Sequence, residues 1–209
     1  NIFKQGIRDS PRRITMALFR KYYESKSIKI LKGNKDLWKD LILYLDRTTS
    51  TGCSFTDYAY LYNYIIKHKP QEILECGTGV TTIVIAHALK YLNNNGHLVS
   101  MESHKEWYDI AVKNFPDNLK AYVEIRLSPA VEDYYSLFRG MRYQEIPQRE
   151  YELVFVDGPE TTASDGTFTF NFDFVNVVKN TKKPVSAIID KRLSTVWVFQ
   201  KIFGNKVKY

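Results

Sequence analysis

The chain has 209 residues, of which 44% are hydrophobic, and it contains two cysteines. This length and composition allow one domain with a substantial core, and they argue against a disulfide framework. No apolar run approaches the roughly 18 residues of a membrane-spanning helix, and the start lacks the apolar segment of a secretory signal peptide, so we expect a cytoplasmic protein.

The net charge of +7 belongs to the N-terminal arm, residues 1–35. This arm holds ten Lys and Arg against two acidic residues, whereas the rest of the chain holds 20 basic and 21 acidic residues. Ile14, Ala17, Leu18 and Tyr22 recur at helical spacing, which predicts a basic amphipathic helix. We favour a solvated helix packed on the domain. Peripheral contact with an anionic membrane, or with nucleic acid or a charged glycan, stays open.

The domain predicted over residues 36–209 begins with two helices. One is expected over 36–46, and the other over 56–69, where Pro70 ends it. The polar loop between them, 47–54, could reach a ligand bound beyond the next strand, although an ordinary linker is the simpler interpretation.

A glycine turn follows the apolar pair 73–74 and leads into a predicted helix over 83–89. Its sequence, from Glu75 to Thr82, is ECGTGVTT. A strand, a glycine turn and a helix in this order bind nucleotide-like cofactors at the carboxyl edge of an α/β sheet. Glu75 would repel a dinucleotide pyrophosphate but attract the ammonium and sulfonium groups of S-adenosylmethionine. Dinucleotide sites carry a third glycine where this chain has Thr82.

Two further acidic residues follow predicted strands. The strand over 97–102 ends in Glu102, which lies 27 residues after Glu75, enough for one strand–helix–strand excursion. A carboxylate there can accept hydrogen bonds from both hydroxyls of a ribose. Asp157 ends another apolar strand. Each acidic residue alone could be a solvated strand end or a helix cap. Three of them, at the spacing of successive strand–helix units, favour one shared site.

The pattern acid-x-Gly-x-Gly at residues 75–79 resembles motif I of the class I, Rossmann-like S-adenosylmethionine-dependent methyltransferases, and residues 151–159 resemble their motif IV. The resemblance covers about residues 55–203. It implies an α/β fold with a doubly wound, mostly parallel Rossmann-like sheet flanked by helices, here with an N-terminal helical extension. It also implies S-adenosylmethionine as cofactor and S-adenosylhomocysteine as product. The residues assigned to the cofactor are Glu75, Gly77, Thr78, Gly79, Thr82, Glu102, Ser103, Ser128 and Asp157.

The chain departs from the family pattern after the third predicted strand, 121–127. The family often carries an acidic residue near Pro129 to receive the adenine amino group, and proline cannot do so. Ser128, backbone groups or apolar contacts would then hold the adenine.

The remaining part of the chain continues the alternation of helices and strands. The predicted elements are helices over 105–115, 131–138 and 193–203 and a strand over 184–190. The loop 158–172, rich in Thr, Asp and Gly, is well placed as a lid over the acceptor. Residues 206–209 look like the beginning of another strand, so we expect the C-terminal strands to be incomplete.

Methyl transfer requires alignment of donor and acceptor and removal of a proton from the acceptor. Asp157 and Asp190 end adjacent predicted strands, so either could be the base or orient a hydroxyl. Lys191 could be an amine base or anchor an anionic acceptor, although a solvated lysine is the simpler interpretation. Catechol-type O-methyltransferases bind magnesium at the corresponding strand ends. Here Lys191 and Arg192 follow Asp190, and because they disfavour a second cation, a divalent metal stays open but is not favoured.

The sequence therefore predicts an S-adenosylmethionine-dependent O-methyltransferase. Asp157-Gly158-Pro159 with Asp190-Lys191-Arg192 is faintly similar to plant glucuronoxylan methyltransferases, which favours a sugar or another small-molecule hydroxyl as acceptor. One alternative is a cofactor-binding module without turnover, and another is an RNA-directed methyltransferase that uses the basic arm. Nucleic acid is disfavoured as acceptor. Amino-methylating enzymes resemble one another in an Asp/Asn-Pro-Pro-aromatic motif, whereas this chain has Asp157-Gly158-Pro159-Glu160. Glu75 and Thr82 argue against a nicotinamide oxidoreductase, and the oligomeric state stays undetermined.

Overall fold

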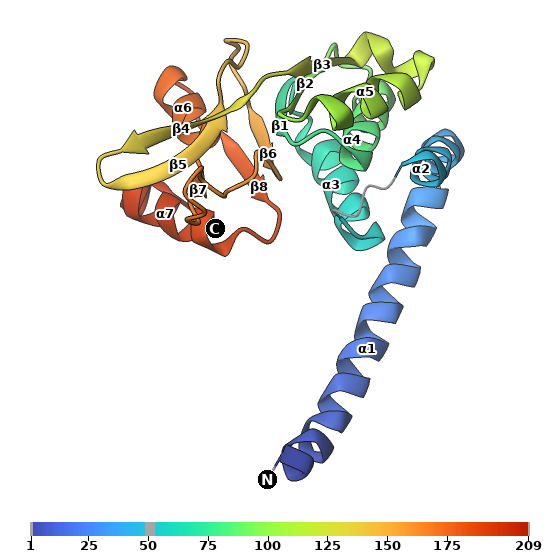
Figure 1. The fold of residues 1–209 in the computed structure, drawn as a ribbon. Coiled ribbons are helices and arrows are strands. Elements are labelled where there is room, and N and C mark those ends of the chain that lie inside the picture. The colour runs from blue at the N-terminus through green and yellow to red at the C-terminus, as the bar shows by residue number, and fades with distance from the viewer. Residues whose placement is uncertain (1, 49–52, 209) are drawn as a thin grey trace.

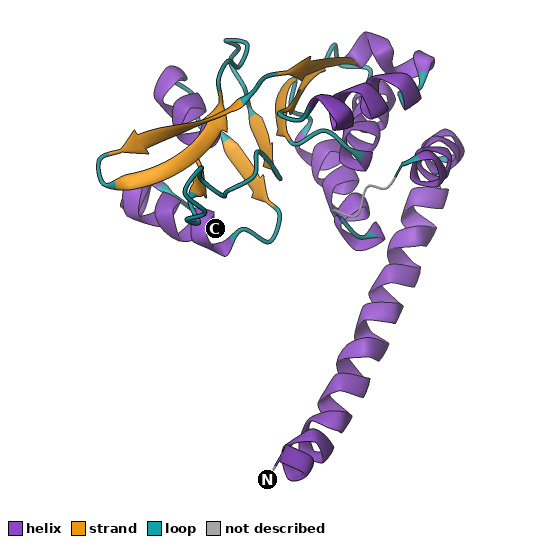
Figure 2. Cartoon of the chain, in the orientation of Figure 1, coloured by secondary structure: helices purple, strands orange, loops and turns teal. Residues whose placement is uncertain are grey.

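A computed structural model describes residues 2–48 and 53–208, and within the first helix it describes the side chains of residues 15, 16 and 18 onward. A parallel sheet lies at the centre with helices on both faces, which confirms the predicted α/β fold (Figure 1, Figure 2). The elements in chain order are α1 (Ile2–Lys32), α2 (Lys35–Arg47), α3 (Phe55–His68), β1 (Glu72–Cys76), α4 (Val80–Leu92), β2 (His97–Glu102), α5 (Lys105–Asn114), η1 (Asp117–Tyr122), β3 (Val123–Leu127), β4 (Ala130–Tyr135), β5 (Phe138–Tyr143), β6 (Leu153–Val156), β7 (Phe170–Asn171), α6 (Asp173–Asn180), β8 (Ser186–Ile189), α7 (Leu193–Phe203) and η2 (Gly204–Lys206).

The central sheet has the strand order β3-β2-β1-β6-β8, and all its strands are parallel. The chain runs outward from β1 to β3 and then returns to β6 on the other side of β1. The strand order therefore reverses between β1 and β6, and ligands of open α/β sheets bind in the crevice at the carboxyl ends of the strands around such a point. Strand register places Glu75 of β1 beside Ser100 of β2 and Phe155 of β6.

The two faces of the sheet bury separate apolar clusters. Successive residues of a strand point to opposite faces, so Ile73 packs with helices α2, α3 and α4, whereas Leu74 and Cys76 pack with α6 and α7. Helix α4 is buried at every residue from Val80 to Leu89, because helices α2 and α3 pack on it and cover it.

The start of α3 is fixed by a capping box, and this fixes the entry of the chain into the site. The Ser54 hydroxyl accepts a hydrogen bond from the backbone N–H of Asp57 at 3.4 Å, and the Asp57 carboxylate accepts one from the backbone N–H of Ser54 at 2.7 Å. Such reciprocal bonds satisfy backbone donors that a helix start leaves unpaired. Cys53, directly before the cap, is thereby held next to the end of the sheet.

The prediction of a helix over residues 131–138 is wrong, because β4 and β5 form an antiparallel hairpin there. Ion pairs link its strands: Glu132 contacts Arg139 at 2.6 Å, and Asp133 contacts Arg142 at 2.6 Å. Such diagonal cross-strand pairs stabilise hairpins, and the aromatic residues in this segment also favour strands. The segment was therefore too short for its apolar spacing to distinguish the helical repeat of 3.6 residues from the strand repeat of two residues.

The two ends of the chain also differ from a plain Rossmann-like unit. Helix α1 extends away from the domain, and its last turns pack on α2 and α3 through the buried Ser27 and Leu31 (Figure 1). At the other end, the short helix η2 and irregular residues 207–208 follow α7, so the strand expected from residue 206 onward is not formed within the described residues. The domain boundary predicted after residue 35 falls one residue inside α2.

Candidate active site

A pocket opens at the carboxyl ends of β1, β2 and β6, where the strand order reverses. Its walls come from the glycine turn after β1, the residues that follow β2 and β6, the start of α3 and the residue preceding α7. The lining residues are Cys53, Tyr58, Gly77, Thr78, Gly79, Val80, Thr81, Glu102, Ser103, His104, Trp107, Tyr143, Asp157, Gly158, Pro159, Glu160 and Arg192.

Two glycines bring the turns after β1 and β6 into backbone contact. Gly77 has a φ of 102°, a conformation that residues with a Cβ rarely adopt, and a Cβ there would lie 3.1 Å from the carbonyl carbon of Asp157. A Cβ on Gly158 would lie 3.0 Å from the Cα of Gly77 and 2.8 Å from the hydroxyl of Tyr143. Larger residues at either position would therefore separate the two turns that form the floor of the pocket.

Glu75 lies beneath the glycine turn and does not line the pocket. Its Oε2 accepts hydrogen bonds from the Ser100 hydroxyl at 2.5 Å and the Thr82 hydroxyl at 2.6 Å. The Thr82 hydroxyl in turn accepts the backbone N–H of Gly79 at 2.9 Å. The acidic residue of the glycine pattern thus supports the turn from below, through two hydroxyl groups.

Burial raises the pKa of Glu75 to about 7, and the neighbouring hydroxyl groups, that of Ser100 most strongly, only partly oppose this rise. Its Oε1 has no hydrogen-bond partner among the described residues. A carboxyl group with such a pKa is partly protonated near neutral pH. The stability of the protein should therefore depend on pH through this group.

We expect Glu75→Gln to remove this pH dependence. The pKa of Glu75 is raised on folding, so ionisation costs stability as the pH rises from the unfolded pKa near 4.5 to the folded pKa of about 7. Relative to the Gln variant, wild type should lose about 3 kcal/mol of unfolding free energy over this range, with no further change above it. Urea unfolding between pH 5 and 8 measures this. Glu106→Gln, at an exposed carboxyl on α5, serves as control, and a constant difference between wild type and Glu75→Gln would contradict the expectation.

Glu102 stands at the end of β2 and forms part of the pocket wall. Its side chain is buried, and Oε1 accepts hydrogen bonds from the backbone N–H groups of Ser103 at 2.7 Å and His104 at 2.9 Å. These bonds fix the orientation of the carboxylate. Trp107, in the first turn of α5, contributes an aromatic surface to the same pocket.

Asp157 directly follows β6 at the opposite wall and is paired with Arg192. A guanidinium nitrogen of Arg192 lies 3.4 Å from Oδ1 of Asp157 and also donates a hydrogen bond to the backbone carbonyl of Asp157. Burial raises the pKa of Asp157 to about 6, Arg192 opposes this rise and Asp190 adds to it. Asp157 is therefore mostly ionised at neutral pH and can accept a proton.

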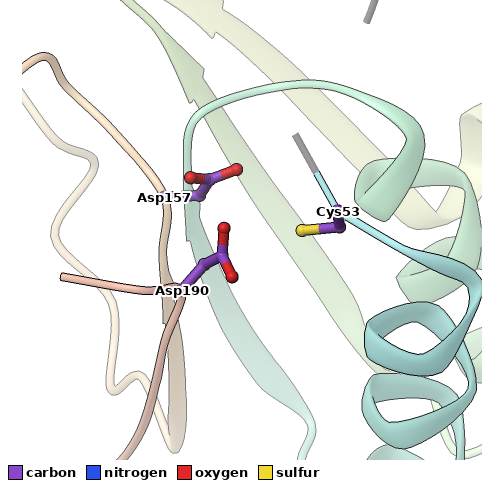
Figure 3. Close-up of side chains that lie close together, drawn as sticks. All are labelled: Cys53, Asp157 and Asp190. Carbon is purple, nitrogen blue, oxygen red and sulfur yellow. The ribbon is translucent and has the colours of Figure 1, made fainter. Parts of the chain in front are cut away.

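Three side chains that could bind a metal lie close together: Cys53, Asp157 and Asp190 (Figure 3). Cys53 precedes α3, and the two aspartates follow β6 and β8. One potential ligand atom of each lies within 4.8 Å of the others. Burial, helped by both carboxylates, raises the pKa of the Cys53 thiol well above its usual range, so the sulfur carries its proton. The cluster is thus two carboxylates facing a neutral thiol.

This donor set does not fit magnesium. Magnesium takes oxygen ligands in near-octahedral geometry, and a protonated thiol is not among them. Asp157 is already paired with Arg192, and Nζ of Lys191 lies 3.9 Å from Oδ1 of Asp190. The positive charge that an ion would supply is therefore present on two side chains.

The predicted site residues other than Ser128 separate into three groups. Six of them line the pocket together: Gly77, Thr78, Gly79, Glu102, Ser103 and Asp157. Glu75 and Thr82 lie below it. Asp190 and Lys191 are outside its lining, although Asp190 approaches Asp157.

Ser128 belongs to a neighbouring hollow rather than to the main pocket. It lines that hollow with Met101 and Gln144, and its hydroxyl accepts the backbone N–H of Glu145 at 3.0 Å. Of the loop over residues 47–54, residues 49–52 lie outside the described residues.

The loop 158–172, predicted as an acceptor lid, is tied to the β4–β5 hairpin. Arg139 of β5 contacts Asp165 at 2.6 Å, and Glu132 of β4 accepts hydrogen bonds from the backbone and hydroxyl of Ser164, both at 3.0 Å. At its base, the Asn171 amide donates to the carbonyl oxygens of Gly158 and Pro159, both at 2.8 Å.

The sequence patterns did not identify several residues of the pocket wall. Among the missed residues are Tyr58, Trp107, Tyr143 and Arg192, whereas Cys53 lies in the loop 47–54, for which contact with a ligand was one interpretation. Trp107 had the best signal, because it lies in the first turn of the helix that follows the strand-end residue Glu102. No sequence signal indicated Tyr143, because its position in the pocket depends on the hairpin. Its hydroxyl donates a hydrogen bond to the backbone carbonyl of Met101 at 3.1 Å.

Comparisons with known proteins agree with this geometry. The chain resembles the O-methyltransferase from Bacillus cereus in complex with S-adenosylhomocysteine (16% identity over 87% of this chain and 78% of that chain, TM-score 0.52). It also resembles a putative O-methyltransferase from Klebsiella pneumoniae (18%, 80% and 76%, 0.53). A third is the O-methyltransferase of tomaymycin synthesis from Streptomyces achromogenes in complex with S-adenosylmethionine (15%, 88% and 78%, 0.52).

At these identities the solved structures establish the fold. No curated protein is significantly similar to the chain in sequence. The sequence model of the family described as a methyltransferase domain, however, matches residues 74–179, slightly more than half of the chain. The chain therefore belongs to the methyltransferase-domain family and has the class I, Rossmann-like fold of the S-adenosylmethionine-dependent methyltransferases.

Proposed function

We propose that this protein transfers the methyl group of S-adenosylmethionine to a hydroxyl oxygen of a sugar or another small molecule. The observation that carries the proposal is the pocket at the reversal of strand order, where the glycine turn, Glu102 and Asp157 form three sides of one space. Family membership supports methyl transfer, and the fold shared with O-methyltransferases supports oxygen as the acceptor atom.

The residues of the pocket fit a cationic, ribose-bearing ligand. Glu102 offers a fixed carboxylate for the ribose hydroxyls, and Trp107 offers a flat surface for a base. The turn from Gly77 to Gly79 allows close approach of the methionine end. When bound, S-adenosylmethionine supplies an electrophilic methyl group whose transfer neutralises the sulfonium.

Asp157 is the group best placed to take the proton of the acceptor hydroxyl. It lines the pocket, it is mostly ionised at neutral pH, and Arg192 fixes its position. General bases with a pKa near the working pH are the effective ones. Asp190 lies behind it in the cluster with Cys53, where it raises the pKa of Asp157.

Calorimetry with the purified chain tests the cofactor. We expect binding of S-adenosylmethionine and of S-adenosylhomocysteine, and none of NAD at the same concentrations. Tight NAD binding without a response to S-adenosylmethionine would contradict the proposal. Product-release assays with sugar, phenol and RNA acceptors then separate an enzyme from a binding module without turnover.

Methyl transfer should not require a divalent ion. Because Arg192 and Lys191 contact the two carboxylates, we expect EDTA and added magnesium each to change the rate by less than about twofold. The measurement is methyl-transfer rate against both reagents, with a magnesium-dependent methyltransferase assayed in parallel as control. A rate that EDTA abolishes and magnesium restores would show that the ion displaces these cations.

A further inference from the structure

Helix α1 exposes large apolar side chains far from the active site. Five of them are each 52–65% exposed: Met16, Leu18, Phe19, Tyr22 and Tyr23. The part of the helix that carries them extends away from the domain (Figure 1). Scattered apolar residues on a surface are ordinary, but a contiguous group of this size on one helix indicates a contact.

These side chains occupy one side of the helix. At 3.6 residues per turn, the five fall within an arc of about 160° around the axis, with Leu18 and Met16 at its edges. Arg20 and Lys21 are exposed on the remaining arc. The Tyr22 and Tyr23 rings meet edge to face with centroids 5.5 Å apart, which makes the apolar side continuous.

The helix is also strongly basic. Its 31 residues include nine Lys and Arg and only two acidic residues, Asp9 and Glu24. Pairing with a second copy of α1 would bring two such charges together, so electrostatics oppose that occupant. A partner that binds both the apolar side chains and the Lys and Arg side chains must present an apolar layer beneath an anionic surface.

We infer that α1 docks on an anionic lipid bilayer, with its apolar side in the headgroup region and its basic side chains at the lipid phosphates. Aromatic and aliphatic residues on one side, with Lys and Arg on the other, are typical of helices that lie in this plane. Within the described residues no helix is both long and apolar enough to span a membrane. The proposed contact lies along the membrane surface, and it depends on lipid charge.

Vesicle sedimentation of the full chain tests this inference. The probes are vesicles of phosphatidylcholine and vesicles in which about a third of the lipid is phosphatidylserine. We expect binding to the anionic vesicles at least about tenfold stronger than to the neutral ones, weakening as salt is added. The triple variant Leu18→Ser, Phe19→Ser and Tyr22→Ser should weaken it by about tenfold or more, and so should the double variant Arg20→Glu and Lys21→Glu.

The control pair Leu137→Ser and Phe168→Ser replaces side chains that are 94% and 88% exposed on the hairpin and the loop. It should bind vesicles like wild type. Thermal unfolding verifies that every variant is folded. Equal binding of wild type and triple variant overturns the inference. So does a wild type that ignores both vesicles but binds RNA, or one that self-associates without lipid and becomes monomeric in the triple variant.

Discussion

Asp157→Asn should lower kcat for methyl transfer by about 10²- to 10⁴-fold, which is the usual contribution of a general base. Asparagine has nearly the same shape and keeps an oxygen that can accept the hydrogen bond from Arg192, so the pocket should retain its form. Affinity for S-adenosylmethionine should fall far less than kcat, because Glu102 keeps its carboxylate and only one negative charge leaves the pocket. Initial rates at saturating cofactor, combined with calorimetry, separate the two effects.

The pH profile gives an independent measurement of the same role. Because the pKa of Asp157 is raised to about 6, the wild-type rate should rise with pH up to about 6 and then level off as the carboxylate forms. The Asn variant should lose this rise. Asp117→Asn, at an exposed residue of η1, is the matched control and should keep both rate and profile. An Asn variant within threefold of the wild-type rate would exclude Asp157 as the base.

Glu102→Ala should weaken S-adenosylmethionine binding by about 100-fold. The expectation assumes that a buried, oriented carboxylate accepts two hydroxyl donors, each bond to a charged group contributing roughly 1.5 kcal/mol. Glu102→Gln retains one acceptor oxygen and should lie between alanine and wild type. Calorimetry with S-adenosylhomocysteine, which shares the ribose, should show the same loss.

A loss of binding in Glu102→Ala has to be separated from local unfolding, because Oε1 also holds two backbone N–H groups. Glu106→Ala removes an exposed carboxylate from the same region and should bind like wild type. The unfolding free energies of both variants complete the comparison. Unchanged affinity in the alanine variant, with the fold intact, would place the ribose elsewhere.

The strand ends that carry the site could be predicted because their signals are local. Apolar runs that end in Glu75, Glu102 and Asp157 predicted β1, β2 and β6, and parallel strands bring their carboxyl ends to one edge. The position of the Glu75 side chain beneath the turn was harder to predict from the sequence. Strand alternation points it to the α4 side, where the hydroxyls of Ser100 and Thr82 receive it beneath the turn.

The rest of the pocket depends on contacts between segments distant in the sequence. The residues around Tyr143 in the sequence contain nothing that places its hydroxyl next to Gly158, because that contact follows from the β4–β5 hairpin. The hairpin itself was interpreted as a helix, since its charge pairs, Glu132 with Arg139 and Asp133 with Arg142, become visible only in the folded chain. Cys53 likewise reaches Asp157 only through the capped start of α3.

The ties between the hairpin and the loop 158–172 have a consequence for the evolution of acceptor choice. Arg139 and Glu132 hold the middle of that loop, while Asn171 holds its base. A hairpin of another length would therefore move the middle of the loop, whose first residues, Gly158, Pro159 and Glu160, line the pocket. Relatives with other hairpin lengths should differ in the bulk of the molecules they admit while retaining the same donor.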